Sequence, residues 1–267
     1  MIKQLFCLVS VMLLCQQTAL AGELSDAVEG DHRTAAYTER DKYRHPVATL
    51  KFFEVRPDQT VVEISPGGGW YTEILAPYLR DEGLLYAAHF PKETDVAYYI
   101  RGRKAFLEKL KSQPDVYDKV VVTEFGPGVE APIAPPGSAD RVLTFRNLHN
   151  WLQGGHAGDA FKQFYAALKP GGILGVVEHR AKPGTSAEQM QSSGYVTEAK
   201  AIELATAAGF ELVSKSEINA NPKDTADHPK GVWTLPPSLR LGDKDREKYL
   251  AIGESDRMTL KFRKPAL

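Results

Sequence analysis

Cysteine is nearly absent from this chain of 267 residues. Its only two cysteines, Cys7 and Cys15, both lie within residues 1–21. If that stretch is removed as a leader, the remaining chain can form no disulfide, supply no thiolate to a metal and use no cysteine nucleophile. A chain without thiols also suits an oxidising compartment.

The chain also lacks a charge imbalance and, after the leader, long apolar runs. Lys and Arg together number 33 against 34 Asp and Glu, which gives a net charge of −1 at pH 7. This balance provides no electrostatic footprint for nucleic acid or an anionic membrane. A membrane-spanning helix needs about 20 apolar residues, and no later segment offers them. We therefore expect neither nucleic acid nor membrane as a partner of the mature chain, and the sequence leaves its oligomeric state open.

Residues 1–21 have the pattern of a secretory signal peptide. Lys3 supplies a positive start, 5–14 form a short apolar stretch, and Ala19-Leu20-Ala21 gives the small-x-small pattern that signal peptidase accepts. We predict cleavage after Ala21 and an exported protein, either periplasmic or secreted. The alternative is that this segment forms a buried first helix of the domain.

Short runs rich in β-branched residues alternate with helix-length segments along the rest of the chain. This alternation predicts parallel strands joined by crossover helices. The expected strands cover 60–64, 84–88, 119–123, 139–145, 172–177 and 211–216, and the expected helices cover 46–54, 70–80, 97–111, 157–168 and 197–208. The alternating polar and apolar residues of 257–263 predict a half-exposed antiparallel strand at the sheet edge.

The pattern indicates one doubly wound α/β domain over residues 22–267. The polar segment 22–56 either forms a helical lid over a cleft, which makes Tyr43 and Arg44 candidate substrate residues, or it is a plain solvated helix. Residues 219–240 are long enough to be a loop or hairpin insertion on the substrate side. Trp233 in that insertion either lines a pocket or packs internally.

Three consecutive glycines follow the first expected strand. Gly67, Gly68 and Gly69 stand at a strand-to-helix switch, where missing side chains let a ligand approach the backbone. Free N–H groups at a helix start favour an anionic group, and open α/β sheets bind ligands at the carboxyl ends of their strands. The alternative is a tight turn without a ligand. No Gly-Lys-Ser/Thr follows, which excludes a P-loop.

At these residues the chain resembles the class I S-adenosylmethionine (SAM) methyltransferases. Segments 61–75, 139–151 and 168–177 look like the first, fourth and fifth motifs of that family, and the turn Leu-Lys-Pro-Gly-Gly at 168–172 is typical of it. The blocks Ile-Ser-Pro-Gly-Gly-Gly-Trp-Tyr and Phe-Arg-Asn-Leu-His resemble most closely a group of predicted exported methyltransferases. The resemblance covers roughly residues 45–265. It implies a Rossmann-like seven-stranded sheet, mostly parallel with an antiparallel last strand.

The resemblance implies SAM as the cofactor. Glu63 and the glycines would contact its amino acid part, with Ser65 standing where the family has its first glycine. At the position where the family has an acid that binds both ribose hydroxyls, this chain has His89. A neutral imidazole accepts only one hydrogen bond. Glu93, four residues on, is a possible substitute for that acid. The expected cofactor-binding residues are Glu63, Ser65, Gly67, Gly68, Gly69, His89, Arg146 and Asn147.

Further polar residues follow the fourth and fifth expected strands. Histidine titrates near neutral pH, so His149 is a candidate general base. Glu178 and His179 form either a base and its orienting partner or caps of a loop, and residues 146–151 either bind a ligand or cap the next helix. We expect catalytic residues His149, Glu178 and His179 and substrate residues Tyr43, Arg44, Trp151 and Trp233. We predict no metal site, because carboxylate–histidine spacings of the metal-binding type are missing.

Three functions fit these observations. The first is a SAM-dependent methyltransferase acting on a small molecule. SAM is made in the cytoplasm whereas the leader indicates export, so the second is a repurposed enzyme of the same fold with lyase or isomerase chemistry at His149 and Glu178. The third is a protein that binds a nucleoside-like ligand without turnover.

Overall fold

The computed structural model describes residues 24–266. The predicted signal peptide, residues 1–21, lies outside the described residues. Among the helices of 24–266, none has the length and apolar character needed to cross a bilayer.

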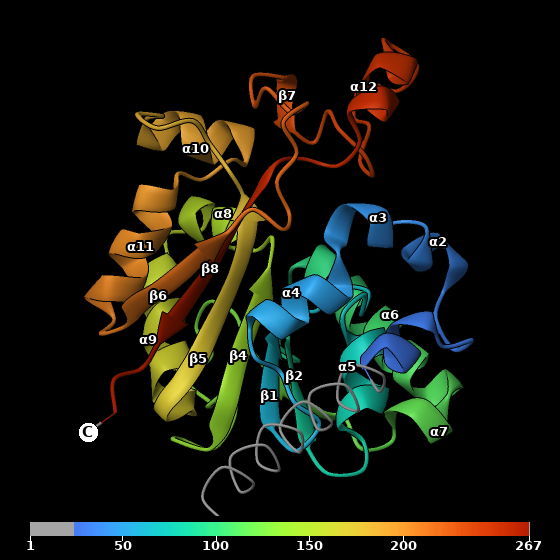
Figure 1. Ribbon diagram of the computed structural model, residues 1–267, viewed down its shortest axis with the longest axis vertical. Helices are drawn as coiled ribbons and strands as arrows, with labels where there is room; N and C mark the ends of the chain where they lie inside the picture. The colour runs from blue at the N-terminus through green and yellow to red at the C-terminus, as the bar shows by residue number, and fades with distance from the viewer. Residues whose placement is uncertain (1–23, 267) are drawn as a thin grey trace, which may run out of the picture.

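A seven-stranded sheet forms the middle layer of the domain (Figure 1). Its strand order is β3-β2-β1-β4-β5-β8-β6. Five parallel-running strands pair side by side from β3 to β5, and β8 pairs antiparallel with both β5 and β6. The strands are β1 (Thr60–Ile64), β2 (Leu84–His89), β3 (Val121–Glu124), β4 (Ala139–Phe145), β5 (Leu168–His179), β6 (Glu211–Ser216) and β8 (Arg257–Arg263). The predicted seven-stranded, mostly parallel sheet with an antiparallel last strand is confirmed.

The prediction that the last strand lies at the sheet edge was wrong. β8 lies between β5 and β6, so β6 forms the edge. Two of the polar residues in its alternating pattern, Arg257 and Thr259, are buried because they find partners inside the protein. Thr259 Oγ1 accepts a hydrogen bond from Asn219 Nδ2 at 3.0 Å, and Arg257 Nη1 lies 3.2 Å from Glu254 Oε2. Internal pairing therefore produced the same alternation that solvent exposure would have produced.

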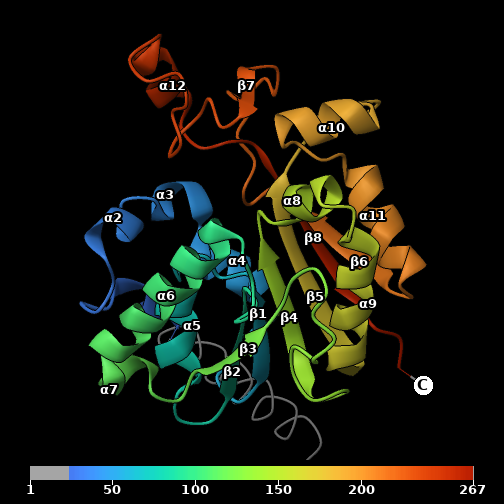
Figure 2. The same cartoon turned by 180° about the vertical axis from the view of Figure 1, so that it is seen from behind.

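Helices cover both faces of the sheet (Figures 1 and 2). One face carries α4 (Pro46–Phe52), α5 (Thr72–Leu79), α6 (Ala97–Ser112) and α7 (Pro114–Tyr117), and the other carries α8 (Leu148–Gln153), α9 (Ala157–Ala167) and α11 (Glu198–Ala207). Beyond the carboxyl ends of the parallel strands lie α2 (Ala35–Thr38), α3 (Asp41–Arg44), α10 (Ala187–Ser193), β7 (Pro229–Val232) and α12 (Arg246–Ile252). The five helices expected from the sequence are all present, with ends shifted by a few residues.

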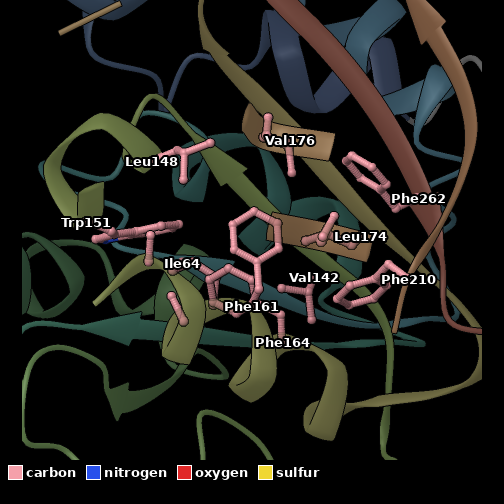
Figure 3. Packing of buried hydrophobic residues seen from close by; sticks show 14 of the residues in the cluster. Ile64, Val142, Leu148, Trp151, Phe161, Phe164, Leu174, Val176, Phe210 and Phe262 are labelled. Carbon is pink, nitrogen blue, oxygen red and sulfur yellow. The ribbon is translucent and has the colours of Figure 1, made fainter. Parts of the chain in front are cut away.

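Neighbouring residues of the central strands face two separate cores. On β1, Val61 packs in the core under α4 and α5, whereas Val62 and Ile64 pack in the core under α8, α9 and α11. This is the two-residue period of a strand covered on both faces. Figure 3 shows the second core, where Phe161 and Phe164 of α9 are fully buried. Burial of each such ring contributes roughly 1.5–3 kcal/mol.

The chain bends sharply at the ends of β1 and β4. Ser65 and Arg146 have φ values of 49° and 62°, a region that is unfavourable for residues with a Cβ atom. Hydrogen bonds hold both bends, because Ser65 N–H donates to Ala88 O at 2.8 Å and Arg146 N–H donates to Val177 O at 2.7 Å. Backbone strain of this kind concentrates at functional sites. Both bends lie at the carboxyl ends of their strands, and Ser65 and Arg146 line the cleft described below.

Candidate active-site cleft

A cleft of about 290 Å³ opens at the carboxyl ends of β1, β4 and β5. Its walls come from residues within 65–70, 145–150, 232–238 and 254–255 and from His179, and residues within 37–44 contribute further side chains. A larger and more open hollow of about 430 Å³ lies elsewhere, beside Pro57 at the amino end of β1. We take the smaller cleft as the candidate site, because ligands of open α/β sheets bind at the carboxyl ends of the strands.

The turn of Gly67, Gly68 and Gly69 offers unpaired backbone donors to this cleft. Gly69 N–H donates to Pro66 O at 2.9 Å, whereas the N–H groups of Gly67 and Gly68 have no hydrogen-bond partner within residues 24–266. Tyr37 Oη donates to Gly68 O at 3.1 Å. A Cβ atom on Gly68 would lie 2.4 Å from Tyr37 Oη. A side chain at Gly68 would therefore displace Tyr37, and glycine leaves two amides open to a ligand.

Residues 34–45, which we call the roof segment, are held over this turn. Thr34 donates from its backbone N–H and from Oγ1 to the Glu73 carboxylate at 3.0 and 2.6 Å. Trp70 Nε1 donates to Tyr37 O at 3.0 Å, and the Arg44 guanidinium lies 4.6 Å from the centre of the Trp70 ring. These contacts fix Tyr37 and Arg44 at the cleft.

Glu63, one of the predicted cofactor residues, lies beneath the turn and not among the residues that line the cleft. Its side chain is buried and accepts a hydrogen bond from Thr72 Oγ1 at 2.6 Å. Burial raises the pKa of Glu63 to about 7. Gly69 is also buried and faces Phe106. Glu63 and Gly69 thus support the turn from below, and any contact of Glu63 with a cofactor stays a prediction.

His89, predicted to meet the ribose, also lies beneath the turn. Its Nδ1 accepts a hydrogen bond from Phe90 N–H at 2.8 Å, and its Nε2 lies 3.1 Å from Gly67 O, which assigns the proton to Nε2. Burial lowers the pKa of His89 to about 4. Both ring nitrogens therefore bind the protein backbone, and a ribose contact would break one of these bonds. The substitute, Glu93, is exposed and does not line the cleft.

The other predicted cofactor residues line the cleft. Ser65, Gly67, Gly68, Arg146 and Asn147 all contribute to its wall. Asn147 Nδ2 donates to Ile64 O at 3.0 Å and so ties the end of β4 to the end of β1. The amide oxygen of Asn147 remains available to a ligand donor.

The three predicted catalytic residues meet at the ends of β4 and β5. His149 Nδ1 lies 3.0 Å from Glu178 Oε1, and Glu178 also accepts the backbone N–H groups of His149 at 3.2 Å and His179 at 2.8 Å. All three side chains are buried, and both histidines line the cleft. Because an ionised carboxylate only accepts hydrogen bonds, Nδ1 of His149 carries the proton and Nε2 is left as an acceptor.

Ser255 joins this cluster from the loop before β8. His179 Nδ1 lies 2.5 Å from Ser255 Oγ. Burial, together with the positive charge of His149 when protonated and of nearby Arg146, holds the pKa of His179 well below its usual 6.5. His179 is therefore neutral at physiological pH, and nothing local in the sequence linked it to Ser255.

The same cluster has the make-up of a metal site. Histidine nitrogens and a carboxylate oxygen from His149, Glu178 and His179 lie within 4.8 Å of one another. The sequence predicted no metal site, because these residues lack a metal-binding spacing in the chain, and the fold brings them together at two strand ends. The guanidinium groups of Arg44 and Arg146 act on His179 as positive charges and disfavour a cation there. These positive charges therefore make the cluster a poor site for a metal ion.

Four arginines surround one glutamate on the side of the cleft that borders β8. We call Arg40, Arg44, Arg146 and Arg257, with Glu254, the arginine cluster. Glu254 accepts from Arg40 Nε at 2.6 Å and from Arg44 Nε at 3.3 Å. Burial raises the pKa of Glu254, but the positive charges of the four arginines outweigh this effect and lower it to about 2. Burial lowers the pKa of Arg146 to about 10.

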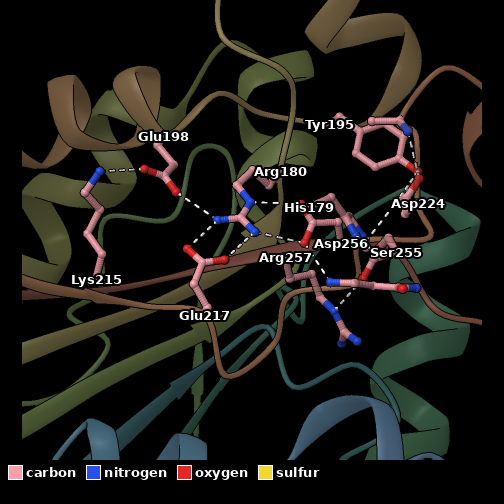
Figure 4. Close-up of polar contacts among 12 residues, drawn as sticks. His179, Arg180, Tyr195, Glu198, Lys215, Glu217, Asp224, Ser255, Asp256 and Arg257 are labelled. Carbon is pink, nitrogen blue, oxygen red and sulfur yellow. Dashed lines mark hydrogen bonds and ion pairs between the residues drawn. The ribbon is translucent and has the colours of Figure 1, made fainter.

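A polar network holds the chain before β8 against the cleft (Figure 4). Arg180 donates to Asp256 at 2.8 and 3.0 Å and to Glu217 at 2.8 and 2.7 Å. Asp256 N–H in turn donates to Asp224 Oδ2 at 2.8 Å. These bonds fix residues 254–257 and so place Glu254 and Ser255 beside the cluster of His149, Glu178 and His179.

Two of the four predicted substrate residues lie in the cleft. Arg44 and Trp233 both line it, and the rings of Trp233 and His149 are 6.1 Å apart. Tyr43 does not line the cleft: it borders a separate hollow, and its carbonyl oxygen accepts a hydrogen bond from Arg257 Nη2 at 2.6 Å. The prediction for Tyr43 is corrected accordingly, because α3 turns Arg44 and not its neighbour towards the cleft.

Trp151 belongs to the hydrophobic core and not to the substrate site. Its side chain is buried in the core under α8 and α9, with its ring 5.4 Å from those of Phe125 and Phe164 (Figure 3). The first turn of α8 directs His149 to the cleft, and Trp151, two residues on, therefore faces inward. The expected substrate contact is replaced by core packing.

Sequence reasoning missed several residues that line the cleft. Among them are Tyr37, Arg40, Glu254 and Ser255. Arg40 could have been found, because it stands four residues before Arg44 and such residues share one face of a helix. Glu254 and Ser255 carry no local signal, since only the network around Arg180 brings them to the site.

Comparisons with solved structures show the fold. A SAM-dependent methyltransferase from Aquifex aeolicus matches with a TM-score of 0.56 and 14% identity over 85% of this chain and 93% of that one. The [4+2]-cyclase SpnF matches with a TM-score of 0.60 and 17% identity over 94% and 96%. Phosphoethanolamine N-methyltransferase 2 from Haemonchus contortus, solved in complex with SAM, matches with a TM-score of 0.54 and 17% identity over 84% and 53%. At these identities the likeness establishes the class I methyltransferase fold. No protein-family model and no curated protein sequence matches the chain.

Proposed function

We propose that this protein transfers a methyl group from SAM to a small-molecule acceptor in the cleft at the carboxyl ends of β1, β4 and β5. One observation supports the proposal above all. A buried His149–Glu178 pair stands beside two free backbone donors of a glycine turn, in a fold shared with SAM-dependent methyltransferases.

The glycine turn suits the amino acid end of SAM. The free N–H groups of Gly67 and Gly68 suit a carboxylate. The amide oxygen of Asn147 suits an ammonium group, since its Nδ2 is already bound to Ile64 O. When bound, SAM supplies an electrophilic methyl group. Ser65 and Tyr37 would border the same molecule, because they line the cleft beside the glycine turn.

His149 is suited to take a proton from the acceptor. The Glu178 carboxylate, 3.0 Å from Nδ1, fixes the tautomer with an unprotonated Nε2 and stabilises the imidazolium that forms. A positioned general base contributes about a hundredfold to ten-thousandfold in rate. His179, which burial keeps neutral, and Ser255 add hydrogen-bonding groups to the same wall. We assign His149 as the base and Glu178 as its orienting residue.

We also propose that residues 1–21 are a signal peptide and that the protein acts outside the cytoplasm. Support comes from the positive Lys3, the short apolar stretch and the sequence Ala19-Leu20-Ala21. The mature protein would begin at Gly22, with the roof segment as part of a lid and 219–240 as an insertion on the substrate side. Mass spectrometry of the N-terminus of exported protein tests this, and a chain that retains Met1 to Ala21 would contradict it.

Calorimetry with SAM and S-adenosylhomocysteine tests the proposed function. We expect both to bind one to one. Gly68→Leu should abolish binding, because the side chain would displace Tyr37 and fill the cleft beside the free amides. Gly158→Leu is the matched control, since a Cβ atom at Gly158 meets nothing within 4 Å.

Three outcomes would overturn the proposal. The first is no heat with either ligand at millimolar concentration, and the second is unchanged binding to Gly68→Leu. The third is tight binding of SAM that stays chemically intact while an acceptor is converted. That result would indicate a different reaction on this fold, which SpnF, a [4+2]-cyclase, shows to be compatible with other chemistry.

A further inference from the structure

The arginine cluster carries more positive charge than the protein neutralises. Four guanidinium groups surround Glu254. The Glu254 carboxylate forms direct ion pairs with three of them, those of Arg40, Arg44 and Arg257. Two further carboxylates act on these arginines, and both already have other partners. Glu178 accepts hydrogen bonds from His149 and His179, and Asp256 accepts them from Arg180. Burying several cations around one anion costs free energy unless a further anion joins them.

Guanidinium nitrogens of this cluster lack hydrogen-bond partners. Nη2 of Arg44 and Nη2 of Arg40 are buried and have no partner among residues 24–266. Arg44 is only 3% exposed and lines the cleft. Arg146 lines it too, and its side chain forms no hydrogen bond or ion pair with any described residue. Arg40, Arg44 and Arg146, whose guanidinium groups are not fully paired, therefore border a cleft that can admit a ligand.

We propose that the arginine cluster is an anion subsite and that the methyl acceptor is a small molecule with a carboxylate or phosphate group, which binds Arg44 and Arg146. The identification of the bound anion as the methyl acceptor rests on the methyl transfer proposed above, whereas the anion subsite itself does not. Guanidinium groups match both anions through paired N–H donors. Arg146 stands three residues before His149, so an anion held there keeps the rest of the acceptor beside the proposed base.

The carboxylate of SAM is a second source of the same chemistry. The free amides of the glycine turn at the end of β1 already suit it. Arg146 and Arg257 instead extend from the ends of β4 and β8, and Glu254 and Ser255 border the same side. We therefore assign the unpaired donors to the acceptor, and the test below separates the two sources.

The test is calorimetry of the mature chain with inorganic phosphate and with malonate, at constant ionic strength, with and without saturating S-adenosylhomocysteine. We expect one or both anions to bind in the presence of S-adenosylhomocysteine. Arg146→Gln should weaken that binding by about tenfold or more, because it removes charged hydrogen bonds. Since Arg146 bonds to no described side chain, this variant should fold, which circular dichroism checks.

Arg263→Gln is the matched control. Arg263 lies at the opposite end of β8 from Arg257 and is exposed, so the same substitution there should leave anion affinity unchanged. A stronger effect with phosphate assigns the acceptor to phosphate esters, and a stronger effect with malonate assigns it to carboxylic acids. Both variants should bind S-adenosylhomocysteine as the native chain does.

The proposal is overturned if neither anion binds at millimolar concentration or if Arg146→Gln binds them as well as the native chain does. It is also overturned if Arg146→Gln weakens S-adenosylhomocysteine but not 5′-methylthioadenosine, which lacks the carboxylate, because the arginines would then hold the cofactor. If phosphate binds while SAM and S-adenosylhomocysteine do not, the anion subsite stands and the methyl transfer fails.

Discussion

The two ends of the cleft are built in different ways. At the glycine-turn end, β1, the turn and α5 follow one another in the chain, and most donors are backbone amides. At the arginine end, Arg40, Arg146 and Glu254 come from three distant segments, and the donors are charged side chains. The first end is therefore a local motif, whereas the second exists only once the whole domain has folded.

This difference separates two roles. Backbone donors with little charge suit a ligand common to many proteins of the fold, and long charged side chains suit an acceptor specific to this protein. His149 and Glu178 lie between the two ends, where both ligands would meet. Substitutions at each end should therefore have separable effects on the cofactor, the acceptor and turnover.

The largest effect is expected from His149→Gln. Loss of the general base should lower turnover about a hundredfold to ten-thousandfold, while S-adenosylhomocysteine affinity stays within about twofold, since His149 belongs to neither end. Formation of S-adenosylhomocysteine with any accepted anionic substrate measures the rate. His156→Gln is the control, because His156 precedes α9 and does not line the cleft. Equal loss in both variants would remove His149 from the proposed role.

An intermediate effect is expected on stability at the glycine-turn end. Burial raises the pKa of Glu63 from its usual 4.5 to about 7, so the folded chain holds this proton more tightly than the unfolded chain does. The contribution of Glu63 to stability is thus fully present below pH 4.5 and is lost as pH rises through 7. Over that window the loss amounts to about 3 kcal/mol.

Glu63→Gln keeps the shape of the side chain and removes this titration. Its free energy of unfolding, measured relative to the native chain by urea denaturation, should therefore rise between pH 5 and pH 8. Glu93→Gln, at an exposed acid, should show no such trend. A pH-independent difference for Glu63→Gln would show that Glu63 is ionised in the fold over this whole range.

The smallest effect is expected from Tyr37→Phe. The variant loses the hydrogen bond from Tyr37 Oη to Gly68 O, which is partly open to solvent. Such a bond contributes about 0.5–1.5 kcal/mol, so S-adenosylhomocysteine should bind about threefold more weakly, and phosphate should bind as before. Tyr86→Phe serves as the control, because no hydrogen bond of its hydroxyl is seen within residues 24–266. Weaker phosphate binding in Tyr37→Phe would mean that the two ends are coupled.

Most of the fold could be predicted from the sequence, because the signals are local. The runs at 60–64, 139–145 and 211–216 coincide with β1, β4 and β6 as observed. The glycine turn was equally visible, since three glycines directly follow the first expected strand. His149, Glu178 and His179 could be brought together because the carboxyl ends of neighbouring parallel strands meet at one edge.

The errors arose where distant partners changed what a local pattern meant. The polar residues of β8 suggested an edge strand, but Thr259 and Arg257 are buried on Asn219 and Glu254. His89 stands at the position of a ribose-binding acid, and its contact with Gly67 O could not be foreseen from the sequence, while its contact with a ribose stays a prediction. The arginine cluster could not be predicted, because no local spacing links Arg40 to Arg146 or to Glu254.

A crystal structure of the mature protein with S-adenosylhomocysteine and phosphate would test the division of the cleft most directly. It should show the amino acid part of S-adenosylhomocysteine on the amides of Gly67 and Gly68, and phosphate on Arg44 and Arg146 within reach of His149. A structure in which the carboxylate of S-adenosylhomocysteine binds the arginines, or in which the glycine turn is closed to the ligand, would contradict the account.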